Sequence, residues 1–174
     1  MEMKKAGEIM IPLDEYPHVP YWLSLRQVIA VMEKSQFDIS GRKSLPRFVL
    51  VFDEAYQLMG LARRRDLLRG LEPDYLSGKP AEYRKKLFDV HVDPNLSEFS
   101  YDKMMRSIRE QAERPVKDVM MPITAAVDYE DHLFKVIYEM VDNNLSLLPV
   151  LQDGKVVGVA RSVEVLHEIA KLLL

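Results

Sequence analysis

The sequence predicts an α/β fold made of two copies of a strand–helix–strand–strand–helix unit, with a helical segment between them. The prediction depends on three blocks of residues that occur twice in the same order. EIMIP at 8–12 matches DVMMP at 118–122, and GLARRRDLL at 60–68 matches GVARSVEVL at 158–166. Matched blocks at a long period indicate a duplicated supersecondary unit. Between them an apolar helical stripe recurs at an offset of 108 positions: Leu25, Val28, Ile29 and Met32 return as Leu133, Val136, Ile137 and Met140.

Repeat 1 occupies residues 1–71 and contains insertions relative to repeat 2. Its first helix follows from the 3.6-residue period of the apolar stripe, with Ser24 as its N-cap. Ten additional residues fall mainly in the loop at 35–46 and in the turn at 53–56, which lacks glycine. The elements expected in repeat 1 are a leading strand at 8–12, a helix at 24–34, strands at 48–52 and 57–62, and a helix from about Arg64.

The connecting segment at 72–115 is densely charged and too long for a simple linker, so we expect it to pack against the repeats. Two helices are expected in it, at about 81–88 and 101–113. The second carries Tyr101, Met105 and Ile108 on one face, and Pro115 ends it.

Repeat 2 occupies residues 116–174 and is the shorter copy. Asp131 is the expected N-cap of its first helix. The pair Asp153-Gly154 favours a tight hairpin turn, because both residues tolerate positive φ angles. The elements expected in repeat 2 are a leading segment at 116–121, a helix from about Leu133, strands at 146–151 and 156–160, and a closing helix at 163–173.

The composition is that of a globular domain in an aqueous compartment. Of 174 residues, 48% are hydrophobic and 29% are charged. The net charge of −3 provides no overall positive field for nucleic acid. No apolar run approaches the roughly 20 residues that cross a bilayer, and the N-terminus lacks the apolar core of a secretory signal. We therefore expect a cytoplasmic protein with neither nucleic acid nor membrane as a partner.

The sequence contains none of the arrangements typical of a catalytic or metal site. It has no cysteine, which excludes disulfides, thiolate nucleophiles and cysteine-bound zinc. Its four histidines are scattered without metal-ligand spacing, and GxSxG, Walker A and GxGxxG motifs are absent. We therefore expect no bound metal and no enzyme activity.

The order of these motifs resembles the CBS (cystathionine-β-synthase) domain. The resemblance is carried by DVMMP at 118–122, the apolar helix ending near Met140, LPVLQDG at 148–154 and VVGVARSVE at 156–164. Repeat 2 matches over its whole length, and repeat 1 matches at both ends but is interrupted in the middle. The resemblance implies two βαββα repeats of the CBS type, packed through their strands as a pseudo-two-fold pair.

The same resemblance implies a function. Members of this family are regulatory, non-catalytic modules that bind adenosine-containing ligands such as AMP, ATP or S-adenosylmethionine between the repeats. The resemblance therefore implies an adenine nucleotide or S-adenosylmethionine as ligand, and a homodimer. We also expect an effector protein that is regulated in trans. The alternative is a ligand-free scaffold that dimerises, or docks proteins through the segment at 72–115.

In this family the ligand is bound at a strand-to-helix turn that reads glycine, two apolar residues, Ser or Thr, two variable residues and Asp. The helix N-terminus and the hydroxyl favour phosphate, and the carboxylate accepts hydrogen bonds from ribose hydroxyls. Apolar residues of the leading strand enclose the adenine. The resemblance thus assigns ligand binding to Met10, Pro12, Gly60, Ala62, Arg63 and Asp66 in repeat 1, and to Met121, Pro122, Gly158, Ala160, Arg161 and Glu164 in repeat 2.

Both turns depart from the family pattern where the hydroxyl is expected. Arg63 and Arg161 stand at that position, and Glu164 replaces the usual Asp. Two interpretations are open: the arginines anchor phosphate, or each pairs with the acid three residues later and fills the ribose cleft. The run from Arg63 to Arg65, with Arg69, is likewise either an anion patch or a solvated helix face. Repeat 1 keeps the Asp, so we expect the working site there.

Overall fold

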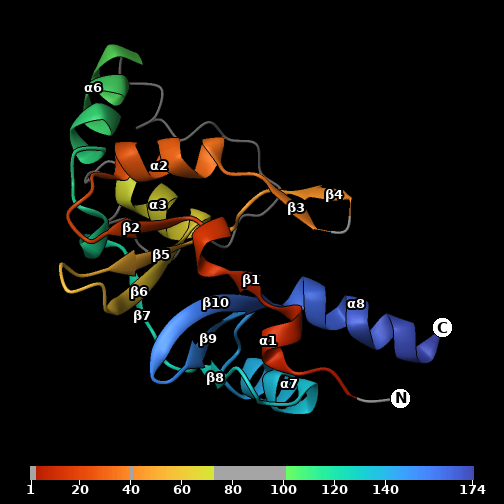
Figure 1. The fold of residues 1–174 in the computed structure, drawn as a ribbon. Coiled ribbons are helices and arrows are strands. Elements are labelled where there is room, and N and C mark those ends of the chain that lie inside the picture. Colours follow the sequence, from red (N-terminus) through yellow and green to blue (C-terminus); the bar gives the residue numbers. More distant parts are fainter. Residues whose placement is uncertain (1–2, 40, 73–100) are drawn as a thin grey trace.

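The computed structural model describes residues 3–39, 41–72 and 101–174. In this part of the chain two four-stranded sheets face each other, and two helices cover the outer side of each (Figure 1). This mixed α/β architecture confirms the predicted fold class. The first sheet has the order β2 (His18–Pro20), β5 (Phe48–Phe52), β6 (Leu58–Arg63) and β7 (Met121–Pro122), and α2 (Leu25–Lys34) and α3 (Arg64–Leu71) cover it. The second has the order β1 (Ile11–Pro12), β10 (Lys155–Arg161), β9 (Leu147–Gln152) and β8 (Val127–Asp128), under α7 (Leu133–Asp142) and α8 (Ser162–Leu173).

The helices α2 and α7 form where the repeated apolar stripe predicts them. Ser24 caps α2, since its side chain accepts a hydrogen bond from the backbone N–H of Gln27 at 3.2 Å. The expected cap of α7 was wrong by one residue. His132 is the N-cap there, and the Asp131 carboxylate instead accepts a hydrogen bond from the backbone N–H of Asp128. Asp131 therefore closes the turn that precedes the helix.

The two hairpins turn by different means. In repeat 2, Asp153 and Gly154 adopt φ angles of 51° and 75°, as the Asp-Gly pair predicts. In repeat 1 the turn without glycine places Tyr56 at a φ of 60°, a conformation that is uncommon for an aromatic residue. Its hydroxyl lies 2.8 Å from Nε2 of His18, and its ring stacks on Phe52, so side-chain contacts hold this turn.

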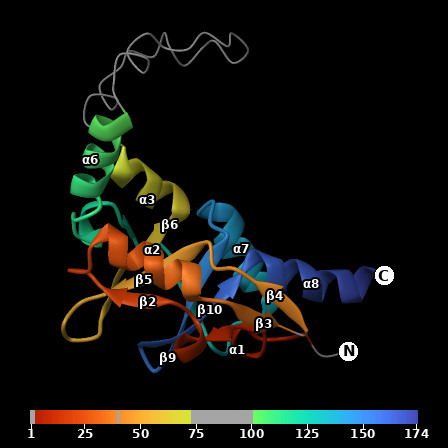
Figure 2. The same ribbon diagram turned by 90° about the horizontal axis from the view of Figure 1, so that it is seen from above.

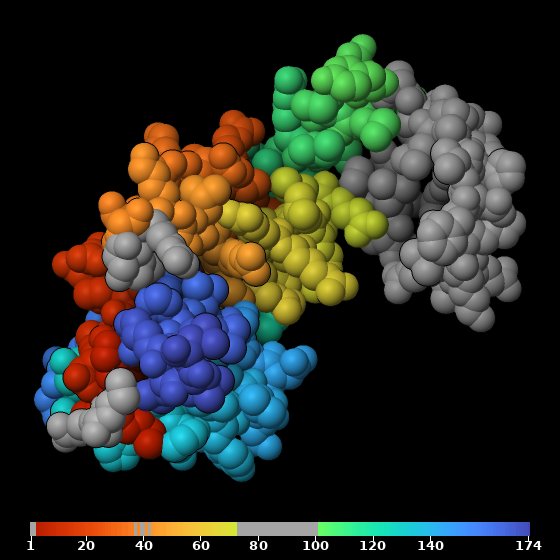
Figure 3. Space-filling model, turned by 90° about the vertical axis from the view of Figure 1, so that its right-hand side faces the viewer, coloured from red at the N-terminus to blue at the C-terminus, as the bar shows by residue number. Residues whose placement is uncertain are grey.

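The leading segments are exchanged between the two halves of the molecule. The short helix α1 (Ala6–Ile9) and strand β1 join repeat 2, where β1 pairs with β10. In return, the 3-10 helix Val116–Asp118 and β7 join repeat 1, where β7 pairs with β6. Figure 3 shows the red N-terminal residues among the blue and cyan residues of repeat 2. Each half is therefore completed by residues from the other repeat.

Repeat 1 has two additions to the shared unit. The inserted loop forms a hairpin of β3 (Phe37–Ile39) and β4 (Arg42–Ser44). The helix α6 (Tyr101–Gln111) packs beside α3, as Figure 2 shows, and the backbone N–H of Arg26 donates to the carbonyl of Ala112. The other helix expected in the connecting segment, at about 81–88, lies outside the described residues.

Candidate functional site

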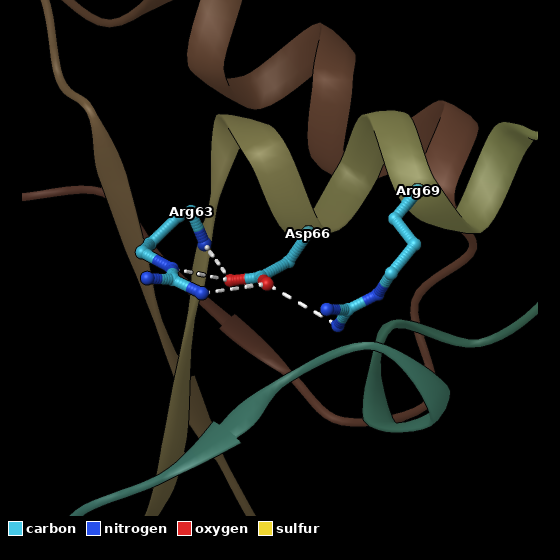
Figure 4. Close-up of polar contacts among 3 residues, drawn as sticks. All are labelled: Arg63, Asp66 and Arg69. Atoms are coloured by element: carbon cyan, nitrogen blue, oxygen red, sulfur yellow. Dashed lines mark hydrogen bonds and ion pairs between the residues drawn. The ribbon is translucent and has the colours of Figure 1, made fainter. Parts of the chain in front are cut away.

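The turn of repeat 1 joins β6 to α3 and brings Arg63 and Asp66 together. Arg63 is the N-cap of α3, and its backbone N–H donates to Oδ2 of Asp66 at 3.0 Å. Its guanidinium donates to the same carboxylate twice, from Nε to Oδ2 at 3.0 Å and from Nη2 to Oδ1 at 3.1 Å (Figure 4). The i, i+3 pair considered from the sequence is therefore present, in bidentate form.

Arg69 reaches the same carboxylate from the next turn of α3. Its Nη2 lies 3.2 Å from Oδ1 of Asp66, so both carboxylate oxygens contact guanidinium groups. The Asp66 side chain is 0% exposed, whereas Arg63 and Arg69 are 37% and 59% exposed. Burial alone would raise the pKa of Asp66, but the hydrogen bonds from Arg63 and the charge of Arg69 hold this pKa below its ordinary value. The turn thus presents two solvent-facing cations above one buried anion.

The leading segment beside this turn comes from repeat 2. Residue Gly60 pairs with Pro122, and a Cβ atom on Gly60 would lie 2.4 Å from the carbonyl oxygen of Met121. Met121 is half-buried and Pro122 is exposed, while Ala62 is buried under α3. The turn of repeat 1 thus lies beside Met121 and Pro122, which belong to repeat 2 in the sequence.

The turn of repeat 2 repeats the ion pair in a closed form. Nε of Arg161 donates to Oε2 of Glu164 at 2.9 Å, and Nη2 donates to Oε1. The two side chains are only 9% and 11% exposed. Nη1 of Arg161 donates to Oγ of Ser44, at 3.1 Å, in the inserted hairpin of repeat 1. This guanidinium is therefore enclosed by groups of the protein itself.

Residues of the first repeat also complete the second turn. Gly158 pairs with Pro12, and its Cα lies so close to β1 that a Cβ atom would be 2.4 Å from the Ile11 carbonyl oxygen and 2.7 Å from Sδ of Met10. Ala160 is fully buried. Gly60 and Gly158 thus lie where the exchanged strands β7 and β1 pair with β6 and β10, and a side chain at either glycine would clash with the exchanged backbone.

Three residues near the two turns were absent from the assigned set. Arg69 could have been found, because it stands three residues after Asp66 on the same helix face. Ser44, in β4, and Tyr16, after β1, had no local signal, since both lie far from repeat 2 in the sequence. Tyr16 is 2% exposed, and burial raises the pKa of its phenol, while the nearby Arg161 charge opposes that rise.

A cavity of about 630 Å³ lies apart from both turns, between the tips of the two hairpins. Its lining is mainly apolar and includes Phe52, Ile123 and Val156. None of the residues assigned to ligand binding lines it. Within residues 3–39, 41–72 and 101–174, no helix has the length and apolar character to cross a membrane.

The chain is similar to known CBS proteins. The CBS domain profile matches residues 116–171. Among solved structures, the CBS domain of a CBS domain-containing membrane protein from Sphaerobacter thermophilus superposes with a TM-score of 0.65 at 18% identity, over 95% of this chain and 87% of that one. CBSX2 from Arabidopsis thaliana, solved with AMP, gives 0.62 at 17% identity, over 98% of each chain.

The cytosolic domain of the Mg²⁺ channel MgtE, solved with ATP, gives a TM-score of 0.60 at 20% identity. The alignment covers 95% of this chain but 49% of that one. No curated protein sequence matches the chain. Repeat 2 alone is recognised by the profile, whereas the fold similarity extends over both repeats. Residues 116–171 are therefore a CBS domain, and the whole chain has the fold of a tandem CBS pair.

Proposed function

We propose that the protein is a non-catalytic regulatory module that senses an adenosine phosphate or a related adenosine ligand at the turn of repeat 1. The observation that carries the proposal is the buried Asp66 carboxylate beneath the exposed guanidinium groups of Arg63 and Arg69. These groups have the chemistry that a nucleotide needs: cations for phosphate, and a carboxylate that accepts hydrogen bonds from ribose hydroxyls. The fold similarity to CBSX2 solved with AMP and to MgtE solved with ATP supports this choice of ligand class.

The ligand would act through the exchanged segments. Arg63 and Asp66 belong to β6 and α3 of repeat 1, whereas Met121 beside them continues into repeat 2. A ligand held at this turn contacts both repeats, so it stabilises one relative arrangement of the two. An effector protein acting in trans would read that arrangement. In this proposal Arg63, which is 37% exposed, moves from Asp66 to the phosphate when the ligand binds, and Arg69 stays beside the Asp66 carboxylate. The contacts with phosphate and ribose then have to offset the hydrogen bonds that the Arg63 guanidinium gives up.

The first prediction concerns ligand binding and Arg63. In thermal unfolding against AMP, ADP, ATP and S-adenosylmethionine, at least one ligand at about 100 times its Kd should raise Tm by roughly 5–10 °C. Arg63→Thr should weaken that ligand at least tenfold in calorimetric titration, since a charged hydrogen bond to phosphate is lost. Arg65→Thr removes the same charge from a neighbouring exposed position and serves as the control.

Each outcome of this experiment has a distinct meaning. No rise in Tm with any ligand of the panel would contradict the proposed function. Tighter binding by Arg63→Thr would mean that the arginine only blocks Asp66, as in the second interpretation of the ion pair. An equal loss in Arg65→Thr would point to the general charge of the turn and away from a specific anchor.

The alternative function is a ligand-free scaffold. Under either function, an exposed apolar surface of repeat 2 favours dimer formation. The outer faces of α7 and α8 expose Phe134, Tyr138, Val141, Val163 and Leu166, each by more than half. At the corresponding positions of α2, 108 residues earlier, stand Arg26, Ala30 and Glu33. Contiguous exposed apolar side chains mark interaction surfaces, and a two-helix face can pack on its own copy. We therefore propose a homodimer through repeat 2.

The second prediction tests that surface. Tyr138→Glu should convert a dimer into a monomer, because it places a charge in the centre of the apolar face. Light scattering after size-exclusion chromatography should show twice the chain mass of 20.2 kDa for the wild type and one chain mass for the variant. Ala30→Glu makes the matching change on α2 and should leave the dimer intact. A wild-type monomer, or a dimer in the Tyr138 variant, would contradict this interface.

A further inference from the structure

The two strand-to-helix turns are related by the duplication, yet they differ in access to solvent. Arg63 is 37% exposed at the first turn, whereas Arg161 is 9% exposed at the second. Their acidic partners are held in the same bidentate way. The difference in exposure between Arg63 and Arg161 therefore comes from the residues that cover each arginine, and not from the geometry of the ion pair.

Two features of repeat 1 close the second turn. The inserted hairpin brings Ser44 within hydrogen-bond distance of Arg161, and in Figure 3 the orange segment that contains this hairpin borders the blue C-terminal segment. Tyr16, from the loop after β1, is buried in the apolar cluster between the two sheets, together with Leu147 and Val159 of repeat 2. Both groups come from the repeat that does not contain the turn.

Neither feature has a counterpart at the first turn. Repeat 2 lacks the insertion at 35–46 that forms the hairpin in repeat 1. The loop of repeat 2 that corresponds to the Tyr16 loop reads Ile-Thr-Ala-Ala at 123–126, with no aromatic side chain. Within the described part of the chain, the first turn thus has small residues where the second has a tyrosine and a hairpin.

The buried guanidinium of Arg161 therefore has partners on more than one side, all supplied by the chain. A ligand at this turn would have to separate a buried ion pair and also detach the hairpin. Separating Arg161 from Glu164 uncovers two buried side chains and detaches the hairpin, whereas at the first turn only the 37% exposed Arg63 has to move away from Asp66. This difference should weaken binding at the second turn by roughly a hundredfold or more relative to the first turn.

We propose that the Arg161 guanidinium fills the second site in place of a ligand, and that Ser44 and Tyr16 thereby limit binding to one ligand per chain. The stoichiometry rests on the function proposed above, whereas the closure of the second turn does not. Sequence duplication created two equivalent turns, and the inserted hairpin makes them unequal. Residues outside both turns thus determine which turn can take a ligand.

Amide hydrogen exchange tests the closure without any ligand. Arg161→Met should speed exchange in the β3–β4 hairpin at least tenfold, because the bond that fastens the hairpin to repeat 2 is lost. Arg63→Met removes the equivalent arginine of the first turn and should leave hairpin exchange unchanged. If Arg161→Met does not fold, Ser44→Ala removes only the hairpin partner and should have the same effect. Unchanged hairpin exchange in Ser44→Ala would overturn the closure, whatever the arginine variants show.

Calorimetric titration with the nucleotide that gives the largest rise in Tm tests the stoichiometry. One site per chain is expected, and two sites of similar affinity would overturn the inference. Absence of any binding would contradict the function proposed for the first turn, and the exchange experiment would still decide whether the second turn is closed.

Discussion

Asp66→Asn is expected to lower the free energy of unfolding by about 1.5–3 kcal/mol at pH 7, the usual range for hydrogen bonds to a charged group. The Asp66 carboxylate is fully buried and accepts hydrogen bonds from the backbone and the guanidinium of Arg63, with Arg69 close by. An amide keeps the shape of the side chain but has one acceptor and no charge. Urea unfolding measures the loss, and Asp142→Asn, an exposed position on α7, should change stability by less than about 0.5 kcal/mol.

The pH dependence of the same pair identifies the source of the loss. The pKa of Asp66 in the folded protein lies below its ordinary value, so its contribution is fully present above the ordinary pKa of about 3.9. It is lost as the pH falls through the lower, folded pKa. The difference between wild type and Asp66→Asn should thus be constant from pH 7 to about 5 and should shrink below about pH 4. A difference that stays constant into strong acid would contradict an ionic origin.

The sequence was a good guide wherever a local pattern decides the structure. The stripe that includes Val28 and Val136 predicts two helices because the 3.6-residue period leaves one face to bury, and both side chains are fully buried. Phe48–Phe52 is a strand over the predicted residues. Asp153-Gly154 predicts its turn because the positive φ angles depend on these two residues alone.

Features that depend on distant contacts could not be predicted in this way. The strands β2 and β8 have three and two residues, too few for a period, and they exist because β5 and β9 offer parallel partners. The exchange of β1 and β7 is likewise a tertiary arrangement. In the candidate site, the spacing of Arg63 and Asp66 allowed an i, i+3 pair as one of two interpretations, and the pair is present. The contact between Ser44 and Arg161, by contrast, joins residues 117 positions apart.

Gly158→Ala is expected to have the largest effect on stability, a loss of about 3 kcal/mol in the free energy of unfolding. Its Cβ atom would lie 2.4 Å from the carbonyl oxygen of Ile11, and a backbone atom cannot move away by changing a rotamer. The strand β1 would have to shift, and with it the pairing of Ile11 with Val159 that joins the leading segment to repeat 2. Gly60→Ala should cost a similar amount, since its Cβ atom would meet the Met121 carbonyl oxygen at the same distance.

Gly154→Ala separates this steric effect from the general cost of replacing a glycine. Gly154 has a φ of 75° but no atom within 4 Å of its would-be Cβ, so its replacement should cost only about 1 kcal/mol. If urea unfolding shows equal losses of stability for Gly154→Ala and Gly158→Ala, the close approach of β1 to Gly158 is not the cause of the loss. A larger loss at Gly158 and Gly60 would mean that the glycine of each turn is required by the exchanged backbone. The choice between ligand-binding and scaffold functions then depends on Arg63, Asp66 and Arg69, and not on the glycines.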